Sequence, residues 1–156
     1  SILNKLAKDY DLPVIVSTHP RTRKRLNAAK NFDLDNRISF LKPFGFLDYI
    51  QLQKNALCVI SDSGTISEES AILDFPAITL RNSMERPEAL DAGSIILTGF
   101  DTNSVISSIK IVIDQHQTNG INKSVPNEYM ISDTSRRVLN LITGTAKLSN
   151  MWSGIR

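Results

Sequence analysis

The stretch that decides the fold of this chain is Ser61-Asp62-Ser63-Gly64-Thr65-Ile66-Ser67-Glu68-Glu69-Ser70. It follows a compact apolar run, residues 56–60, which predicts a buried parallel strand. After Gly64 the apolar spacing becomes helical. The stretch therefore predicts a strand, a tight turn and a helix, with backbone N–H groups and the positive end of a helix dipole aimed beyond the strand tip. The small side chains of Ser61 and Ser63, and Gly64 itself, would let an anion approach the backbone closely.

Glu69 has an unusual place in the predicted helix. On a helical wheel it falls beside Ile66 and Leu73, within or bordering the apolar arc, whereas Glu68 points away. A carboxylate there needs hydrogen-bond donors, and it would repel a phosphate but suit a pair of ribose hydroxyls. The alternative is that Thr65-x-x-Glu68 forms a capping box and that Glu69 is a solvated flank. The residues alone leave both interpretations open.

Length and composition indicate a single globular domain over residues 1–156, because 41% of the residues are apolar. No apolar segment approaches the length of a membrane span, and no signal-peptide pattern opens the chain. The first residue, Ser1, already lies in an amphipathic pattern, so we expect a piece of a longer protein. The one cysteine, Cys58, lies in the apolar strand as buried filler, which excludes an intrachain disulfide and favours a cytoplasmic location.

The net charge of +2 is unevenly spread, with +5 in residues 1–42, −6 in residues 43–101 and +3 in residues 102–156. The only dense basic cluster is Arg21-Thr-Arg-Lys-Arg25, which has no interleaved aromatic residues. We therefore expect neither a nucleic-acid partner nor a membrane partner. A solvated helix face is the favoured interpretation of the cluster, with a phosphate-facing role as the alternative.

Predicted strands and helices alternate along the chain. Strands are expected at residues 13–17, 37–41, 56–60, 77–80 and 94–98. Helices are expected at 1–9, 21–30, 47–55, after Gly64, at 87–91, at 102–117 and after a cap at Ser132-Asp133. The inward side chains should be Leu47, Ile50 and Leu52 in the third helix and Val105, Ile106, Ile109 and Ile113 in the helix at 102–117, while Val138, Leu139 and Ile142 are among the apolar residues of the last helix. This order predicts an α/β fold, a parallel sheet with helices on both faces, whose ligands bind beyond the carboxyl ends of the strands.

Two further residues fall near those strand ends. Arg86 precedes Pro87, which disfavours helix and holds Arg86 extended in its loop. A guanidinium there, facing Gly64, would clamp a diphosphate from two sides, whereas the alternative is a surface run, Glu85–Glu88, with local ion pairs. Tyr49 lies one helix before the central strand, where it would pack on a base or would simply be a partly buried helix-face tyrosine.

Several familiar sites are absent from the sequence. Neither G-x-G-x-x-G nor G-x-x-x-x-G-K-[ST] is present, so the common dinucleotide and Walker signatures fail. Two distant histidines and one buried thiol make no recognisable metal site, and we expect no metal and no cofactor. A catalytic pair of Ser63 with His19 is disfavoured, because Asp-Ser-Gly-Thr is not a G-x-S-x-G elbow.

Taken together, these motifs resemble a known family. The runs Ser61-Asp-Ser-Gly-Thr-x-x-Glu-Glu69, Phe75-Pro76 and Glu85-Arg-Pro-Glu-Ala89, with Gly93, are similar to the C-terminal domain of the non-hydrolysing UDP-N-acetylglucosamine 2-epimerases. The residues of the first and third runs are especially similar to those of the bacterial capsule-pathway branch, which makes UDP-N-acetyl-L-fucosamine by inverting carbon 2. The resemblance covers essentially the whole chain. It implies a Rossmann-like domain, one half of a glycosyltransferase-B-type enzyme with substrate between its two domains, and we expect a homodimer of the full-length protein.

The resemblance also implies roles in holding a UDP-sugar. Ser63, Gly64 and Thr65 would present donors to the pyrophosphate, Glu69 would hold the ribose hydroxyls, and Arg86 would lie near the phosphates. The commoner members have a second glycine where this chain has Thr65.

Two more positions and the mechanism follow from the same resemblance. Tyr49 would border the uracil, and His19 matches a histidine that faces a regulatory UDP-sugar in some members. The family eliminates UDP to a glycal and adds it back after proton transfer at carbon 2. Its acid–base carboxylates lie in the N-terminal domain, so the resemblance implies no catalytic residue in this chain.

Two other function classes stay open from the sequence. One is the donor-binding domain of a UDP-sugar glycosyltransferase, which shares the fold and a ribose-binding glutamate; the run Glu85–Ala89 argues against it. The other is a non-enzymatic nucleotide-binding module of the response-regulator kind. That module would have an acidic cluster at the first strand end, where this chain has Thr18-His19.

Overall fold

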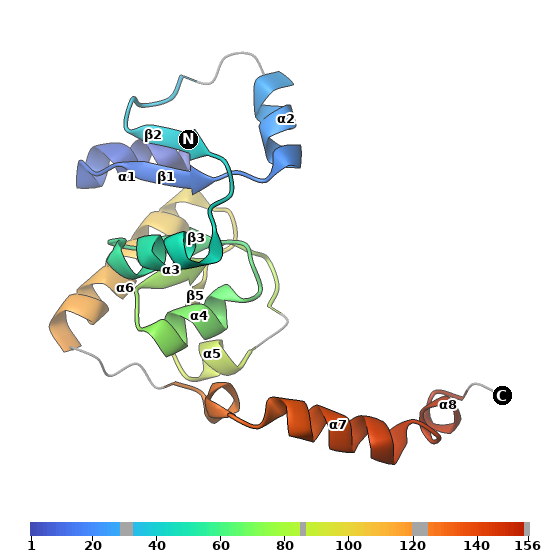
Figure 1. Ribbon diagram of the computed structural model, residues 1–156. Helices are drawn as coiled ribbons and strands as arrows, with labels where there is room; N and C mark the ends of the chain where they lie inside the picture. The colour runs from blue at the N-terminus through green and yellow to red at the C-terminus, as the bar shows by residue number, and fades with distance from the viewer. Residues whose placement is uncertain (29–32, 85–86, 120–124, 155–156) are drawn as a thin grey trace.

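The structure is a computed structural model and describes residues 1–28, 33–84, 87–119 and 125–154 (Figure 1). The helices are α1 (Ile2–Tyr10), α2 (Pro20–Ala28), α3 (Phe46–Asn55), α4 (Ile66–Leu73), α5 (Glu88–Asp91), α6 (Thr102–Asn119), α7 (Thr134–Thr145) and α8 (Ser149–Trp152), with a 3-10 turn η1 (Asn127–Met130). The strands are β1 (Val14–Ser17), β2 (Ile38–Leu41), β3 (Val59–Ser61), β4 (Ala77–Thr79) and β5 (Ile96–Leu97). The predicted alternation of strands and helices is confirmed.

All strand pairs are parallel, but the described strands form two sheets. β1 pairs with β2, and β3, β4 and β5 form a second sheet in that order. The strands thus form two sheets where one was predicted, while the α/β class with parallel pairing is confirmed. Val14 of β1 still packs against the core of the three-stranded sheet. Side-chain packing, and not a backbone ladder, joins the two sheets.

The core is built on the two faces of β4, whose three residues are all buried. Ile78 belongs to a cluster with Leu6 of α1 and the apolar face of α6. Ala77 faces the opposite way, into a cluster that includes Ile66 of α4 and Ala89 of α5. Because successive side chains of a strand point to opposite faces, this strand carries a helical layer on each side, as the sequence predicted.

The inward face of α6 agrees with the prediction, and that of α3 agrees only in part, because Ile50 and Leu52 are half-buried and Leu47 is not. Val105, Ile109 and Ile113 are buried, whereas Leu47 in α3 is 74% exposed. The most buried residue of α3 is Gln53, with 2% exposure. The hydrophobic pattern misplaced this helix because its inward face contains an amide that meets a polar group of α4.

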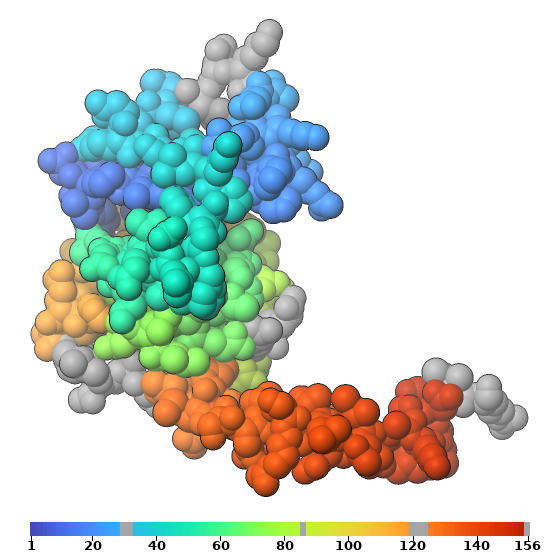
Figure 2. Space-filling model, viewed as in Figure 1, coloured from blue at the N-terminus to red at the C-terminus, as the bar shows by residue number. Residues whose placement is uncertain are grey.

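The last two helices extend away from the rest of the molecule (Figures 1 and 2). The apolar residues predicted for α7 are there, but Val138, Leu139 and Ile142 are exposed. Asp133 is the N-cap residue of α7, yet its side chain makes no cap hydrogen bond. Its carboxylate accepts hydrogen bonds from two arginine side chains of the first turn instead. The predicted capping at Ser132-Asp133 is therefore right in position and wrong in chemistry.

None of the helices in the described ranges combines the length and the apolar character needed to cross a bilayer.

We expect Ile109→Ala to lower the free energy of unfolding by about 2–5 kcal/mol, because it empties part of the core between α6 and β4. Ile109 is 2% exposed, whereas Ile111 on the same helix is 46% exposed. The matched variant Ile111→Ala should change stability by no more than about 0.5 kcal/mol. Urea unfolding of both variants measures the difference, and equal losses would contradict this assignment of the core.

Candidate functional site

The turn between β3 and α4 is organised by its own hydroxyls. The Ser63 N–H donates to Ser61 Oγ at 3.1 Å, and the Thr65 N–H donates to Ser63 Oγ at 3.3 Å. The oxygens Ser63 Oγ and Thr65 Oγ1 are 2.9 Å apart. Thr65 makes no side-chain cap hydrogen bond, so the alternative of a Thr65–Glu68 capping box is wrong. The turn thus places the exposed Ser63 and Thr65 and the half-buried Gly64 at the N-terminus of α4.

Glu69 is half-buried in the first turn of α4 and is held by a partner from α3. The Gln53 side chain donates from Nε2 to Glu69 Oε2 at 2.5 Å. A half-buried carboxylate needs such a donor, because a charged group that loses water without gaining another hydrogen-bond partner is destabilised. The alternative that Glu69 is a solvated flank is therefore wrong.

Tyr49 lies one helical turn before Gln53 on α3 and is half-buried. Burial raises the pKa of Tyr49 above its ordinary value, the negative charges of Glu69 and Asp62 raise it further, and a hydrogen bond with Gln53 lowers it. Those influences mean that Tyr49, Gln53 and Glu69 lie together where α3 meets α4. We call these three residues the α3–α4 cluster.

Gln53 is the member of the cluster that sequence reasoning missed. Its amide breaks the apolar pattern of α3, and glutamine is an ordinary surface residue of helices. A signal was present in the spacing, because Gln53 follows Tyr49 by four residues and so shares its helix face.

Arg86, which was predicted to lie near the phosphates, is outside the described residues, as is Glu85. His19 is described and does not belong to the α3–α4 cluster. His19 is exposed before α2, where its Nδ1 accepts a hydrogen bond from the Arg21 N–H at 3.2 Å and its carbonyl accepts one from the Arg23 N–H at 3.0 Å. The imidazole therefore caps the basic helix that follows β1.

The basic run of α2 is mostly solvated, as the sequence favoured. Arg21, Lys24 and Arg25 are exposed. Arg23 is the exception, because its Nη2 donates to the Phe40 carbonyl of β2 at 2.5 Å.

The arrangement at the start of α4 can bind a ligand that has both hydroxyls and an anionic group. Glu69 is an acceptor for hydroxyls, and the turn before α4 offers hydroxyls and the positive end of a helix dipole. Glu69 and Asp62 are the charged groups that act on Tyr49, and both are negative. In the part of the chain that the structure describes, no group of three or more His, Cys, Asp and Glu residues could hold a metal ion.

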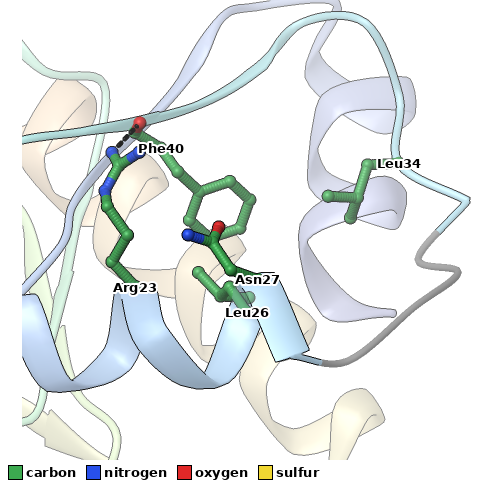
Figure 3. A pocket seen from close by; sticks show the side chains of 5 residues that line it. All are labelled: Arg23, Leu26, Asn27, Leu34 and Phe40. Atoms are coloured by element: carbon green, nitrogen blue, oxygen red, sulfur yellow. Dashed lines mark hydrogen bonds between the residues drawn. The ribbon is translucent and has the colours of Figure 1, made fainter.

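A small cavity lies elsewhere, between α2 and β2 (Figure 3). Its volume is about 160 Å³, and its lining residues are Arg23, Leu26, Asn27, Leu34 and Phe40. Ligand pockets usually measure about 300–1,000 Å³. The cavity is too small for a nucleotide, and none of the predicted site residues lines it.

A protein-family model described as UDP-N-acetylglucosamine 2-epimerase matches residues 1–143. The chain is 33% identical over 148 residues to a UDP-N-acetylglucosamine 2-epimerase of Methanococcus maripaludis, covering 93% of this chain and 39% of the relative. It is 39% identical over 109 residues to the enzyme of that name from Methanocaldococcus jannaschii, covering 68% of this chain and 30% of the relative. The chain thus spans less than two fifths of the length of either curated relative.

Solved structures give the same likeness. A UDP-N-acetylglucosamine 2-epimerase from Rickettsia bellii superposes with a TM-score of 0.82 at 39% identity, over 95% of this chain and 40% of that one. The Methanocaldococcus jannaschii epimerase, solved in complex with UDP-GlcNAc and UDP, superposes with a TM-score of 0.76 at 33% identity, over 89% and 38%.

The proximity of Tyr49 and Glu69 is measurable without any ligand. We expect Glu69→Gln to lower the pKa of Tyr49, because it removes a negative charge that disfavours the phenolate. Glu68→Gln, the neighbouring variant, should leave that pKa in place. NMR titration of ring-labelled tyrosine gives both values, and an unshifted Tyr49 in Glu69→Gln would contradict the α3–α4 cluster.

Proposed function

The chain belongs to the UDP-N-acetylglucosamine 2-epimerase family, and we propose that it is the UDP-binding part of a UDP-N-acetylhexosamine 2-epimerase. The observation that carries the proposal is the half-buried Glu69 carboxylate, fixed by Gln53 in the first turn of α4. A fixed acceptor suits a ribose diol, which supplies two O–H donors, and it excludes a phosphate from the same spot.

The phosphates would lie at the other end of the same turn. The donors to the pyrophosphate would be the hydroxyls of Ser63 and Thr65 and the backbone N–H of Gly64, at the positive end of the α4 dipole, because the Ser63 and Thr65 N–H groups are bonded within the turn. Arg86 would contribute the cation, which the negative charges of Glu69 and Asp62 make necessary. Glu69 lies about one helical turn from the start of α4. This separation suits the spacing between the ribose and the pyrophosphate of a nucleotide.

The base would lie against α3. Tyr49 is only half-buried and lies near Glu69. Its ring would therefore be open to a base attached to the ribose that Glu69 holds. An aromatic face there would pack on the uracil by stacking. We further propose that His19, on the separate element before α2, faces a second UDP-sugar with a regulatory role.

In the proposed reaction a base removes the proton from carbon 2 of the sugar while the bond from carbon 1 to the UDP oxygen breaks, which leaves a glycal and free UDP. Protonation of carbon 2 from the opposite face and return of UDP to carbon 1 then give the epimer. This chain would hold the UDP in place during both steps and favour its negative charge. The carboxylates that transfer the proton would lie outside this chain, in a segment that corresponds to the part of the relatives that it does not span.

The finer assignment is to the capsule-pathway branch, with the UDP-N-acetyl-L-fucosamine series as substrate, in a cytoplasmic homodimer with an N-terminal domain. What supports it is the resemblance of two runs of the sequence, Ser61–Ser70 and Glu85–Asp91, to that branch.

We expect Glu69→Gln to weaken UDP binding by about 1.5–3 kcal/mol, the usual cost of a lost charge-assisted hydrogen bond, and Glu68→Gln to have a far smaller effect. Wild-type chain should also prefer UDP to TDP, because TDP lacks the 2′-hydroxyl. Isothermal titration calorimetry with UDP, UMP and TDP measures these affinities. Equal losses in the two variants would contradict the ribose assignment.

We expect the purified chain to bind UDP weakly and to leave carbon 2 of a UDP-N-acetylhexosamine unexchanged, because positioned proton-transfer groups supply a large part of the rate. Incubation with UDP-N-acetylglucosamine and the fucosamine-series substrate in heavy water, followed by NMR, makes the comparison. Exchange at carbon 2 above the buffer background would place the catalytic base within these residues.

A further inference from the structure

The Gln53 side chain is a buried amide with a specific set of contacts. It is 2% exposed, and its Nε2 donates to Glu69 Oε2 at 2.5 Å. The same side chain lies beside the Tyr49 hydroxyl, whose pKa it lowers. Its Oε1 is buried and has no hydrogen-bond partner among the described residues.

The orientation of this amide follows from its neighbour. A flipped amide would place its oxygen against the carboxylate oxygen of Glu69, where two acceptors repel each other. The amide NH2 group has two donors, so it can serve Glu69 and Tyr49 at once. Both partners thereby become fixed relative to α3.

Packing alone is a poor reason for a glutamine at this position. A buried amide oxygen without a partner is unfavourable, and an unbranched apolar side chain of the same length would fill the space without that penalty. The favourable part of the arrangement is the hydrogen bond to a negatively charged group, which is stronger than one between neutral groups.

We propose that Gln53 is a positioning residue for nucleoside recognition: its amide fixes the Glu69 carboxylate and the Tyr49 side chain as one unit, so that the ribose hydroxyls meet a preset acceptor. The inference rests on the proposed function, because it takes Glu69 as the ribose contact. One carboxylate oxygen is occupied by Gln53, which restricts the rotation of the group and sets the direction of the other oxygen.

The test compares two ligands that differ by one hydroxyl, UDP and 2′-deoxy-UDP, in isothermal titration calorimetry. Wild-type chain should bind UDP about tenfold more tightly, the value of one hydrogen bond to a charged group. Gln53→Met should reduce that ratio to about threefold or less while the chain stays folded by circular dichroism. Gln51→Met, an exposed position on the same helix, should keep the wild-type ratio.

The outcomes separate the inference from the function on which it rests. If Glu69→Gln abolishes the ratio and Gln53→Met preserves it, Gln53 does not position Glu69 and the inference is overturned alone. If Gln53→Met weakens the binding of UDP and of 2′-deoxy-UDP by the same factor, Gln53 has only a structural role and the inference is likewise overturned. If Glu69→Gln itself preserves the ratio, the ribose assignment in the proposed function fails.

A second variant serves if Gln53→Met does not fold. Gln53→Glu has nearly the same shape and places a carboxylate against Glu69, so the two share a proton or repel each other. We expect the preference for UDP over 2′-deoxy-UDP to be lost near neutral pH and to return partly as the pH falls, relative to wild-type chain at each pH. A wild-type ratio at neutral pH would overturn the inference.

Discussion

The complete burial of β4 is the constraint on which the rest of the structure depends. Its neighbouring residues Ala77 and Ile78 point into two different hydrophobic clusters, so each face must be covered by helices. α1 and α6 cover one face, and α4 and α5 the other. Once these layers are in place, β3 pairs alongside β4 and ends at Ser61, from which the chain can reach α4 only through a short turn. The position of the candidate site is thus a consequence of how one strand is buried.

The site differs from the core in being held by polar contacts. α4 packs its apolar residue Ile66 on the sheet, which leaves Glu69 near the boundary between core and solvent. There a carboxylate is stable only with a donor, and Gln53 of α3 supplies it. The same hydrogen bond explains why α3 carries a polar residue, Gln53, on its inward side. The Gln53–Glu69 pair therefore joins α3 to α4 and also carries the proposed contact with the ribose.

Local patterns predicted much of this structure, because the alternation of short apolar runs with helical spacing specifies strands and helices. The inward face of α6 was predictable for the same reason, as was the need of Glu69 for a donor. Pairing between strands depends on distant residues, and the separation of β1–β2 from β3–β5 was not predicted. The donor itself was also missed, since nothing in an isolated helix says that Gln53 faces a carboxylate 16 residues later. The exposure of Val138 and Ile142 in α7 was equally beyond local patterns, because an apolar stripe does not reveal what covers it.

We propose that a uridine nucleotide binds where β3 leads into α4, beside α3. The most direct measurement is NMR mapping of the isotope-labelled chain during addition of UDP, with assigned backbone amides and side-chain amides. We expect the largest chemical-shift changes at Gly64, Thr65 and the Gln53 side chain. Changes concentrated at Leu26 and Phe40, which line the cavity between α2 and β2, would contradict it.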